Sequence, residues 1–321
     1  MPELTPQAKG QEGAVSVQFR VDANEARMRL DQFLTVRIKR LSRSRLQRFI
    51  LRGDVVLNGA SVSPSQRVSA GDKVVLWKLP PPEPLAGGWP TEICRGWDWV
   101  ALNKPGDLTV HPTARYFHQT VTAWMDLQDQ GFEDARLAHR LDRETSGVLM
   151  VALGLAADRR FGIAFERKQV RKEYLAVVEG HAPEKMLCEG AIGNLVEQGI
   201  IRLKQGVVAD GAAAVTEVRL ERHLQGNRSL VRCFPHTGRM HQLRVHLSHL
   251  GHPIVGDKIY GSAPDQAYDE FCEQGASPEL NTLFGAKRQM LHAVALEFPD
   301  PQTGRCRVEA TIPDDFLALL G

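Results

Sequence analysis

The sequence predicts an α+β fold in two domains, and three observations support the prediction. First, 321 residues is long for one domain and comfortable for two, taking about 100–200 residues per domain. Second, strand-type apolar runs and helical periodicities intermix without a regular βαβ repeat or a G-x-G-x-x-G turn. Third, a stretch rich in proline and glycine, residues 79–90, separates a short basic part from a longer one.

The composition excludes several classes of protein. It is 43% hydrophobic and 24% charged, and no apolar run approaches the roughly 18 residues of a membrane span. The five cysteines are scattered and form no C-x-x-C pair, a pattern typical of free thiols rather than of disulfides or a zinc site. The polar start of the chain lacks the apolar core of a signal peptide. We therefore expect a cytoplasmic protein that has no membrane contact.

The net charge of +2 is the sum of opposite charges on two unlike parts. Residues 1–90 hold 14 Lys and Arg against 8 Asp and Glu, a net +6, which leaves −4 for residues 91–321. Such asymmetry indicates a basic binding module joined to a second domain. We expect a disordered tail over 1–17, the module over 18–78, a linker over 79–90 and the second domain over 91–321.

The basic module is predicted to contain two helices and a small sheet. Leu30, Phe33 and Leu34 recur at helical spacing, Ser42 can cap a second helix, and Gly53 ends it. The strands expected after that helix are 55–57 and 74–76, with a turn at Asn58-Gly59.

The helical part of the module is strongly basic. Nine basic residues within 27–52 are opposed by one acidic residue, Asp31. Such a run is often a solvated helix face, but arginines on two helices of a small domain suit phosphate contacts better. The segments Arg29-Leu30-Asp31-x-Phe33-Leu34, Ser42-Arg43-Ser44 and Gly53-x-Val55-x-x-Asn58-Gly59 together resemble the alpha-L RNA-binding motif. This resemblance implies RNA contacts through Arg29, Arg40, Arg43, Arg45, Arg48 and Arg52.

The second domain is expected to be a mixed sheet with helices. Its predicted strands lie near 99–102, 148–153, 174–178, 215–220, 230–234, 291–298 and 307–312. A helix is expected over 156–171, with Phe161 and Phe165 facing inward, and another over about 240–250.

The segment with the clearest chemistry is Ala138-His139-Arg140-Leu141-Asp142-Arg143-Glu144-Thr145-Ser146-Gly147-Val148-Leu149. Its charged residues run directly into an apolar strand, and Arg140 and Arg143 flank Asp142 and favour its ionised form. An ionised carboxylate at the mouth of a sheet can serve as a nucleophile or a base. On charge alone, an ion pair that braces a turn is the simpler interpretation.

Nine residues of this segment, HRLDRETSG, resemble the H-R-L-D-x-x-T-S-G loop of the RluA-type pseudouridine synthases, which carries the family's catalytic aspartate. Three further segments resemble the family in order and spacing. They are Leu102-Asn103-Lys104-Pro105-Gly106 with Val110-His111-Pro112, Arg171-Lys172-Glu173-Tyr174-Leu175-Ala176, and the stretch 236–247 followed by Gly256-Asp257-x-x-Tyr260-Gly261. The resemblance spans roughly 95–312 and implies a largely antiparallel catalytic domain.

The resemblance also implies roles for individual residues. Asp142 would be the nucleophile or base that opens the N-glycosidic bond of a uridine, by attack on the sugar or on the base. Tyr174 would stack on the flipped uracil, and its hydroxyl could help to remove the proton from carbon 5. Arg140 would fill the gap left by the extruded nucleotide. Arg244 would pair with Asp142, and the other residues expected to bind substrate are His139, Leu243, Arg239 and Lys104.

Helical spacing leaves the partner of Asp142 open. The apolar residues of 240–250 form a stripe with Arg239 and Arg244 at its edges. An arginine at the rim of a buried stripe needs a carboxylate partner, and either one satisfies this requirement. The resemblance favours Arg244.

Three remaining features carry weaker predictions or none. The histidines between 236 and 252 lack the spacing of a zinc pair, so we expect them to be structural or to face RNA. The basic residues of 159–172 fit either an RNA groove or a solvated helix face. The acidic region 264–284 is poorly patterned for a surface that faces substrate, and we make no prediction for it.

The resemblance therefore implies an RNA pseudouridine synthase, which we expect to need no cofactor and to act as a monomer on RNA. Large-subunit ribosomal RNA is the favoured target, because the basic module accompanies that branch of the family. A transfer RNA target is one alternative, and a catalytically silent RNA-binding or ribosome-assembly factor is another. An aspartyl-phosphate hydrolase is disfavoured, because the sequence has no D-x-D pair and no glycine-rich phosphate loop.

Overall fold

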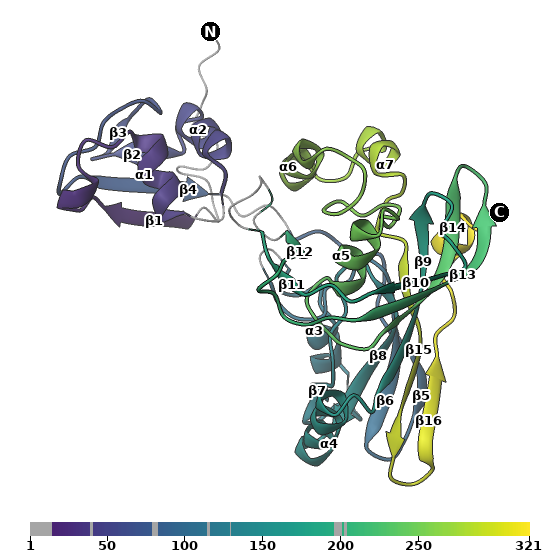
Figure 1. Ribbon diagram of the computed structural model, residues 1–321. Helices are drawn as coiled ribbons and strands as arrows, with labels where there is room; N and C mark the ends of the chain where they lie inside the picture. Colours follow the sequence, from purple (N-terminus) through teal and green to yellow (C-terminus); the bar gives the residue numbers. More distant parts are fainter. Residues whose placement is uncertain are drawn as a thin grey trace. The chain divides into compact units, whose positions relative to one another are not determined.

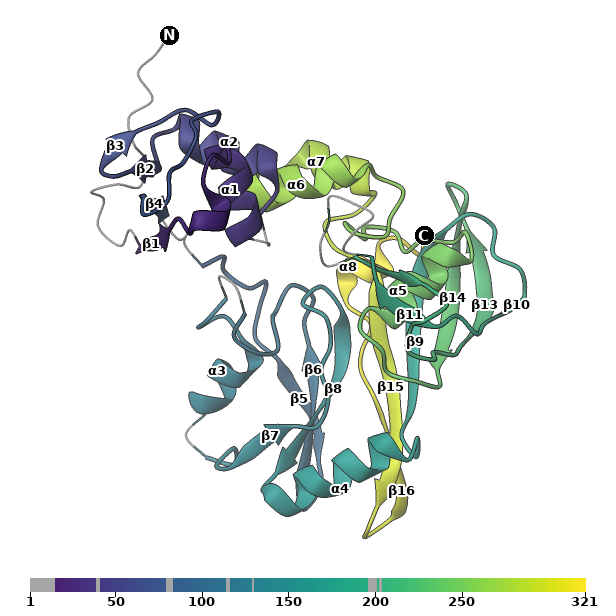
Figure 2. The same ribbon diagram turned by 60° about the vertical axis from the view of Figure 1, so that its left-hand side comes forward.

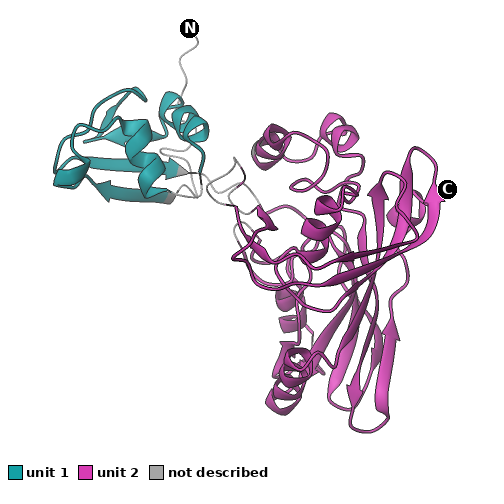
Figure 3. Cartoon of the chain, viewed as in Figure 1, with its two compact units in different colours: residues 1–82 teal, residues 83–321 magenta. Residues whose placement is uncertain are grey.

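The computed structural model describes residues 15–38, 41–78, 83–113, 116–128, 130–195, 201 and 204–321 (Figures 1 and 2). The chain divides into two compact units, Met1–Pro82 and Glu83–Gly321 (Figure 3). Each unit has its own sheet and its own hydrophobic core.

The first unit packs two helices against a small antiparallel sheet (Figure 1). Its elements are β1 (Val15–Arg20), the 3-10 turn η1 (Ala23–Glu25), α1 (Leu30–Arg37), α2 (Arg43–Leu51), β2 (Val55–Leu57), β3 (Ala60–Ser61) and β4 (Lys73–Lys78). The strands lie in the order β1-β4-β2-β3. Phe33, Leu46 and Val74 are among the fully buried residues of the core. The predicted helix pair and the two predicted strands are confirmed.

Local sequence explains the ends of these elements. At the start of α2, Ser42 Oγ accepts a hydrogen bond from the Arg45 N–H at 3.4 Å, which confirms the predicted cap. Asn58 and Gly59 have φ values of 51° and 87°, the pair of left-handed conformations that a two-residue hairpin loop requires.

Strand β1 was not predicted. It begins at Val15 and pairs with β4 along its whole length, so the expected disordered tail over 1–17 is wrong for residues 15–17. The apolar residues of β1 alternate with polar ones over a short span that periodicity alone did not separate from the polar start of the chain. Residues 1–14 lie outside the described part of the chain.

The second unit is built on one large sheet. Its strands are β5 (Thr91–Arg95), β6 (Trp99–Lys104), β7 (Ala135–Leu137), β8 (Ser146–Leu153), β9 (Arg171–Glu179), β10 (Lys185–Cys188), β13 (Thr216–Leu224), β14 (Arg228–Pro235), β15 (Leu291–Asp300) and β16 (Gly304–Glu309). They lie in the order β10-β13-β14-β9-β15-β8-β6-β5, with β16 beside β15 and β7 beside β8. A separate pair joins β11 (Ile192–Asn194) to β12 (Gln205–Val207). The predicted α+β class with a mixed, largely antiparallel sheet is confirmed.

The helices of the second unit lie against this sheet and around its edges (Figure 2). They are α3 (Val121–Asp126), α4 (Leu155–Glu166), α5 (Gln242–His249), α6 (Asp265–Gln274), α7 (Pro278–Phe284) and α8 (Asp314–Leu317). From α4, Phe161 is buried against Phe298 at a ring distance of 5.4 Å, as its predicted inward orientation requires. From α5, Leu243 and Leu247 join the core that covers β9 and β14.

The sheet has a seam at its centre. Among the pairings of the described strands, only β8 and β15 run parallel, and they pair at Ser146 with His292 and at Gly147 with Ala293. This short contact joins two antiparallel halves. The predicted catalytic loop, residues 138–145, leads directly into β8 at the seam.

Two segments of the second unit differ from expectation or had no predicted structure. Within the predicted linker, Glu83 accepts hydrogen bonds from the N–H groups of residues 117–119 at 2.6–3.0 Å, so this end of the linker is bound rather than loose. The acidic region 264–284 forms α6 and α7, which pack Phe271 and Phe284 together. Within the described residues, no helix combines the length and the apolar character needed to cross a membrane.

We expect Gly147→Ala to destabilise the second unit by about 2–4 kcal/mol. Gly147 has a φ of 112°, and a Cβ there would overlap the backbone of Ala293 across the seam. Gly162→Ala is the matched control: it lies in α4 with open space around it and should stabilise the helix by about 0.5–1 kcal/mol. Urea unfolding of both variants measures the difference, and equal effects would contradict a close-packed seam.

Candidate active site

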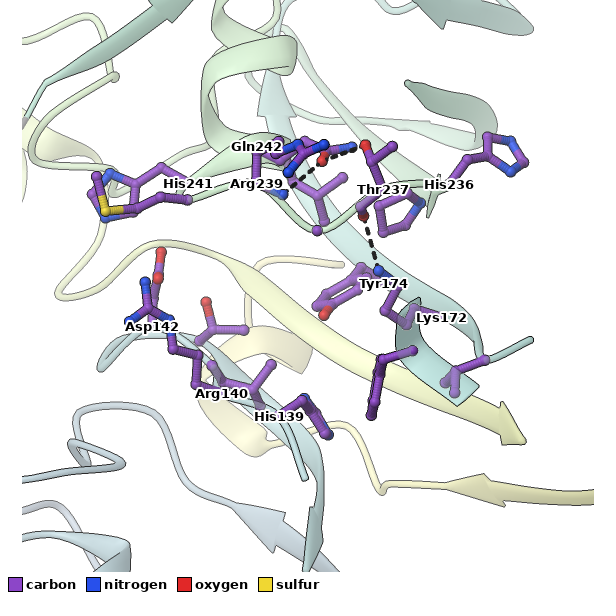
Figure 4. A pocket seen from close by; sticks show the side chains of 18 of the residues that line it. His139, Arg140, Asp142, Lys172, Tyr174, His236, Thr237, Arg239, His241 and Gln242 are labelled. Atoms are coloured by element: carbon purple, nitrogen blue, oxygen red, sulfur yellow. Dashed lines mark hydrogen bonds between the residues drawn. The ribbon is translucent and has the colours of Figure 1, made fainter. Parts of the chain in front are cut away.

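A cavity of about 660 Å³ lies where the loop before β8, strand β9 and the loop between β14 and α5 meet (Figure 4). Its wall combines apolar side chains with charged ones from all three segments. The lining side chains that can bind, orient or react with a substrate are His139, Arg140, Asp142, Lys172, Tyr174, Arg239, Leu243 and Arg244. The structure thus brings together most of the residues predicted to form the site.

The centre of the site is one guanidinium held between two carboxylates. Arg244 Nη1 lies 2.9 Å from Asp142 Oδ2, while its Nε and Nη2 lie 2.6 Å and 2.9 Å from the two oxygens of Asp257. Asp257 Oδ1 also accepts the N–H groups of Ile259 and Tyr260 at 2.9 Å and 3.0 Å. Asp257 therefore fixes the plane of Arg244, and Arg244 in turn orients Asp142.

The electrostatics of this group keep Asp142 ionised. Burial raises the pKa of Asp142, but the positive charge of Arg244, the hydrogen bond from Arg244 and a contribution from His241 together lower that pKa below its usual range. The side chain of Asp142 is 33% exposed, whereas that of Asp257 is fully buried. The buried carboxylate is therefore the anchor, and the partly exposed one remains open to the cavity.

Tyr174 extends from β9 into the same cavity (Figure 4). Burial and the nearby charge of Asp142 both raise its pKa above the ordinary value for tyrosine. The hydroxyl therefore stays protonated at neutral pH. A neutral phenol ring suits stacking and hydrogen-bond donation better than the acceptance of a proton.

Lys104 does not line the cavity, contrary to the prediction that it binds substrate. Its side chain is fully buried, and Nζ donates to the carbonyl oxygens of Pro105, Leu108 and Arg143 at 2.8–2.9 Å. Burial lowers its pKa to about 7. The lysine ties the turn after β6 to the loop that carries Asp142, so it acts by positioning that loop.

His139 lines the cavity and also supports the loop. Its Nε2 accepts the N–H of Met150 at 3.1 Å, and its ring lies 5.4 Å from the ring of Phe165. Burial, aided by the charge of Lys172, lowers the pKa of His139 to about 4. A neutral imidazole forms part of the wall and cannot supply a positive charge to RNA near neutral pH.

A buried ionic network lies beneath the loop and was missed from the sequence. Glu144 accepts hydrogen bonds from Lys258 at 2.8 Å and from Arg143 at 2.7 Å. Arg288 donates to the Glu144 carbonyl oxygen at 3.0 Å and pairs with Asp315 at 2.6 Å. Since these groups come from distant segments, no local spacing could have indicated the network. They fix the backbone directly after Asp142.

The three other predicted substrate residues differ in their placement. Arg140 is exposed and lines the cavity, and Leu243 forms a buried part of the wall. Arg239 Nε donates to the Ala213 carbonyl oxygen at 3.1 Å. The open question of which arginine pairs with Asp142 is therefore settled in favour of Arg244.

The arginines predicted to bind RNA in the first unit are not equivalent. Asp31 is fully buried and accepts hydrogen bonds from Arg29 and Arg43 at 3.0–3.1 Å. Burial opposes its ionisation, but the hydrogen bonds from these arginines and from Gln47 lower its pKa well below the usual value. Arg43 therefore holds the start of α2 to α1, and Arg29 braces the start of α1.

The remaining predicted arginines lie on or after α2. Arg52 pairs with Asp54 at 2.8 Å. The structure gives Arg45 no ion pair among the described residues, and Arg48 is exposed. Arg40 lies outside the described residues.

The histidines of 236–252 do not form a metal site in the described part of the chain, where no group of three or more His, Cys, Asp or Glu side chains converges. His246, for example, is buried between Thr216 Oγ1 and the Gly190 carbonyl oxygen, each at 2.9 Å. This histidine is structural.

Comparisons with known proteins show the family to which this chain is similar. The profile of the RNA pseudouridylate synthase family matches residues 98–249, and that of the S4 domain matches residues 28–74. Ribosomal large subunit pseudouridine synthase D of Xylella fastidiosa is 35% identical over 95% of this chain and 92% of its own. Ribosomal large subunit pseudouridine synthase C of Escherichia coli K12 is 32% identical over 92% of each chain. The solved structure of Human RNA Pseudouridylate Synthase Domain Containing 1 is 30% identical with a TM-score of 0.57, covering 74% of this chain and 89% of its own.

We expect Arg244→Met to raise the pKa of Asp142 above 3.8, the ordinary value for aspartate, because burial then acts without the opposing positive charge. Side-chain carbon shifts of Asp142, followed by NMR as a function of pH, measure this change. The wild-type carboxylate should titrate below 3.8, so that its contribution to stability is lost only as the pH falls through that lower value.

The same substitution should destabilise the unit by about 3–5 kcal/mol, because it leaves Asp257 charged, buried and without its cation. Arg305→Met, at an exposed ion pair with Glu297, is the control and should change stability by less than about 1 kcal/mol. An unchanged Asp142 titration in Arg244→Met would show that Arg244 does not set its protonation.

Proposed function

Since the chain belongs to the RNA pseudouridylate synthase family and carries an S4 domain, we propose that it converts uridines of large-subunit ribosomal RNA to pseudouridine, with Asp142 as the reacting carboxylate. The observation that carries the assignment of Asp142 is its position. It is the partly exposed member of the Asp142–Arg244–Asp257 group, and it faces a cavity that Tyr174 also lines.

The reaction is an isomerisation and needs no second substrate. The bond between N1 of uracil and C1′ of ribose breaks, a bond between C5 and C1′ forms, a proton leaves C5, and N1 gains one. Asp142 supports either route to that product: its carboxylate can attack C1′ of the sugar or C6 of the base. Arg244 keeps the carboxylate ionised and aimed, and Asp257 prevents Arg244 from turning away.

The cavity walls explain how the base would be held. A uracil extruded from the RNA is positioned by stacking on Tyr174 and by contact with Leu243. Arg140 is exposed at the cavity and can occupy the place that the extruded nucleotide leaves, which offsets part of the few kcal/mol that flipping costs. Its planar guanidinium stacks on bases in a way that an ammonium group does not.

The first unit would increase the affinity for RNA through contacts with its phosphates. S4 homology and the relatives named for the ribosomal large subunit support ribosomal RNA as the partner. A cytoplasmic, monomeric enzyme fits this role. A silent RNA-binding factor would not need a carboxylate held ionised in a cavity, and this favours the enzyme.

We expect Asp142→Asn to abolish pseudouridine formation while leaving RNA affinity within a few-fold of the wild type. The amide keeps the shape of the side chain but removes its negative charge and its nucleophilicity. Chemical mapping of pseudouridine in ribosomal RNA, combined with filter binding, separates the two effects. Asp126→Asn, at an exposed position at the end of α3, is the control and should be fully active. Activity retained by Asp142→Asn would refute the role of Asp142.

We expect Arg45→Gln to weaken RNA binding and to reduce the slope of log affinity against log salt by about 1. Loss of one phosphate contact releases one counterion fewer on binding. Arg29→Gln should instead lower the stability of the first unit, because Arg29 holds the buried Asp31. Filter binding between low and moderate salt measures the slope, with Arg305→Gln as the control. An unchanged slope would remove Arg45 from the RNA surface.

A further inference from the structure

Lys172 places an amine in the cavity that none of the proposed roles uses. Its Nζ donates to the Thr237 carbonyl oxygen at 2.9 Å (Figure 4). In the part of the chain that the structure describes, Lys172 has no ion-pair partner. The cavity therefore holds a cation whose charge is not neutralised by a neighbouring carboxylate.

Strand geometry places this amine beside the place proposed for the flipped uracil. Lys172 and Tyr174 are two residues apart on β9, so their side chains leave the same face about 7 Å apart. Both line the cavity, whereas Glu173 between them faces away and pairs with Arg232 and Arg307. In Figure 4, Asp142, Tyr174 and Lys172 follow one another across the cavity.

This order of side chains sets the orientation of a stacked uracil. If the base covers Tyr174 with its N1 edge towards Asp142, its far edge lies along β9 towards Lys172. That edge of uracil carries carbonyl oxygens, which accept hydrogen bonds but have no full charge before the reaction. A phosphate is a poorer fit, because phosphates lie on the outside of the RNA, where the exposed cations that line the cavity, Arg140, Lys168 and Arg239, can meet them.

We propose that Lys172 is a further catalytic residue, whose ammonium donates a hydrogen bond to a carbonyl oxygen of the flipped uracil and stabilises the negative charge that the base acquires during the reaction. The inference rests on the proposed function. Both routes open to Asp142 move electrons into the base. When the N1–C1′ bond breaks, its electron pair spreads over the ring and its carbonyl oxygens. When the carboxylate adds to C6, the displaced π electrons reach the C4 oxygen.

In either case the proton stays on Lys172 and no other reactant is needed. A positive charge placed where negative charge develops, in a site with little water, is among the strongest forms of transition-state stabilisation. Burial lowers the pKa of Lys172 to about 8, which brings its proton affinity closer to that of the developing oxyanion and strengthens the hydrogen bond as charge builds up. Its present acceptor, the Thr237 carbonyl oxygen, holds the amine in place before substrate enters.

The first experiment compares Lys172→Met and Lys172→Arg with the wild type in single-turnover assays on the target RNA. Methionine keeps the length of the side chain without its charge. It should lower the rate of pseudouridine formation about 100-fold with RNA affinity within a few-fold, since removal of one such donor costs roughly 10²–10³ in rate. Lys172→Arg, which keeps the charge, should recover part of the loss. Lys185→Met, at an exposed lysine on β10 paired with Glu217, is the control and should match the wild type.

The second experiment replaces the target uridine by 4-thiouridine or 2-thiouridine, since sulfur is a weaker hydrogen-bond acceptor than oxygen. Sulfur in place of the oxygen that Lys172 contacts should slow the reaction of the wild type. The same replacement should not slow Lys172→Met relative to its own rate on uridine. Full activity of Lys172→Met, or equal thio effects in both proteins, would overturn the proposal while the pseudouridine synthase assignment stands. A wild-type protein that forms no pseudouridine would instead overturn the proposed function.

Discussion

The organisation of the site depends on one constraint: a buried arginine must be shared between a carboxylate that fixes it and a carboxylate that it keeps ionised. Arg244 meets this requirement because Asp257 holds two of its nitrogens, and the third reaches Asp142. A buried cation with one anionic partner would neutralise that partner in a closed pair. With two partners, the fully buried Asp257 anchors the group, and Asp142 stays ionised and partly exposed.

Other contacts of the second unit hold the loop that carries Asp142 in a fixed position relative to Arg244. The loop that carries Asp142 enters the sheet at its only parallel step among the described strands, where Gly147 allows the close approach of Ala293. Lys104 binds the loop from one side through backbone carbonyl oxygens, and Glu144 is bound to Lys258 beneath it. These contacts are buried and directional, so a shift of the loop would leave charged groups without partners. Their role is to keep the proposed reacting carboxylate in one place.

Local features of the fold could be predicted from the sequence, whereas long-range partners could not. The Ser42 cap, the Asn58-Gly59 turn and the inward face of Phe161 depend on neighbouring residues, and all three are confirmed. The resemblance of HRLDRETSG to a known loop located Asp142, and the choice of Arg244 over Arg239 followed from the same resemblance. Spacing could not show that Asp257 anchors Arg244 or that Lys104 is buried away from the cavity, because both depend on which loops meet at the seam. Lys172 was noted in the sequence within a segment that resembles the family and within a basic strip, with no role assigned to it, and its place in the cavity follows from the face that β9 turns inward.

The central proposal is that Asp142, aimed by Arg244, reacts with a nucleotide extruded into the cavity beside Tyr174. The most direct measurement is a structure of the protein bound to its target RNA with 5-fluorouridine at the modified position, where fluorine blocks loss of the proton from C5. We predict the fluorinated base inside the cavity, an Asp142 oxygen bonded to C1′ or C6 or within about 3–3.5 Å of one of them, and Arg244 still held by Asp257. A target base that remains stacked in the RNA, or one seated away from Asp142, would contradict the proposal.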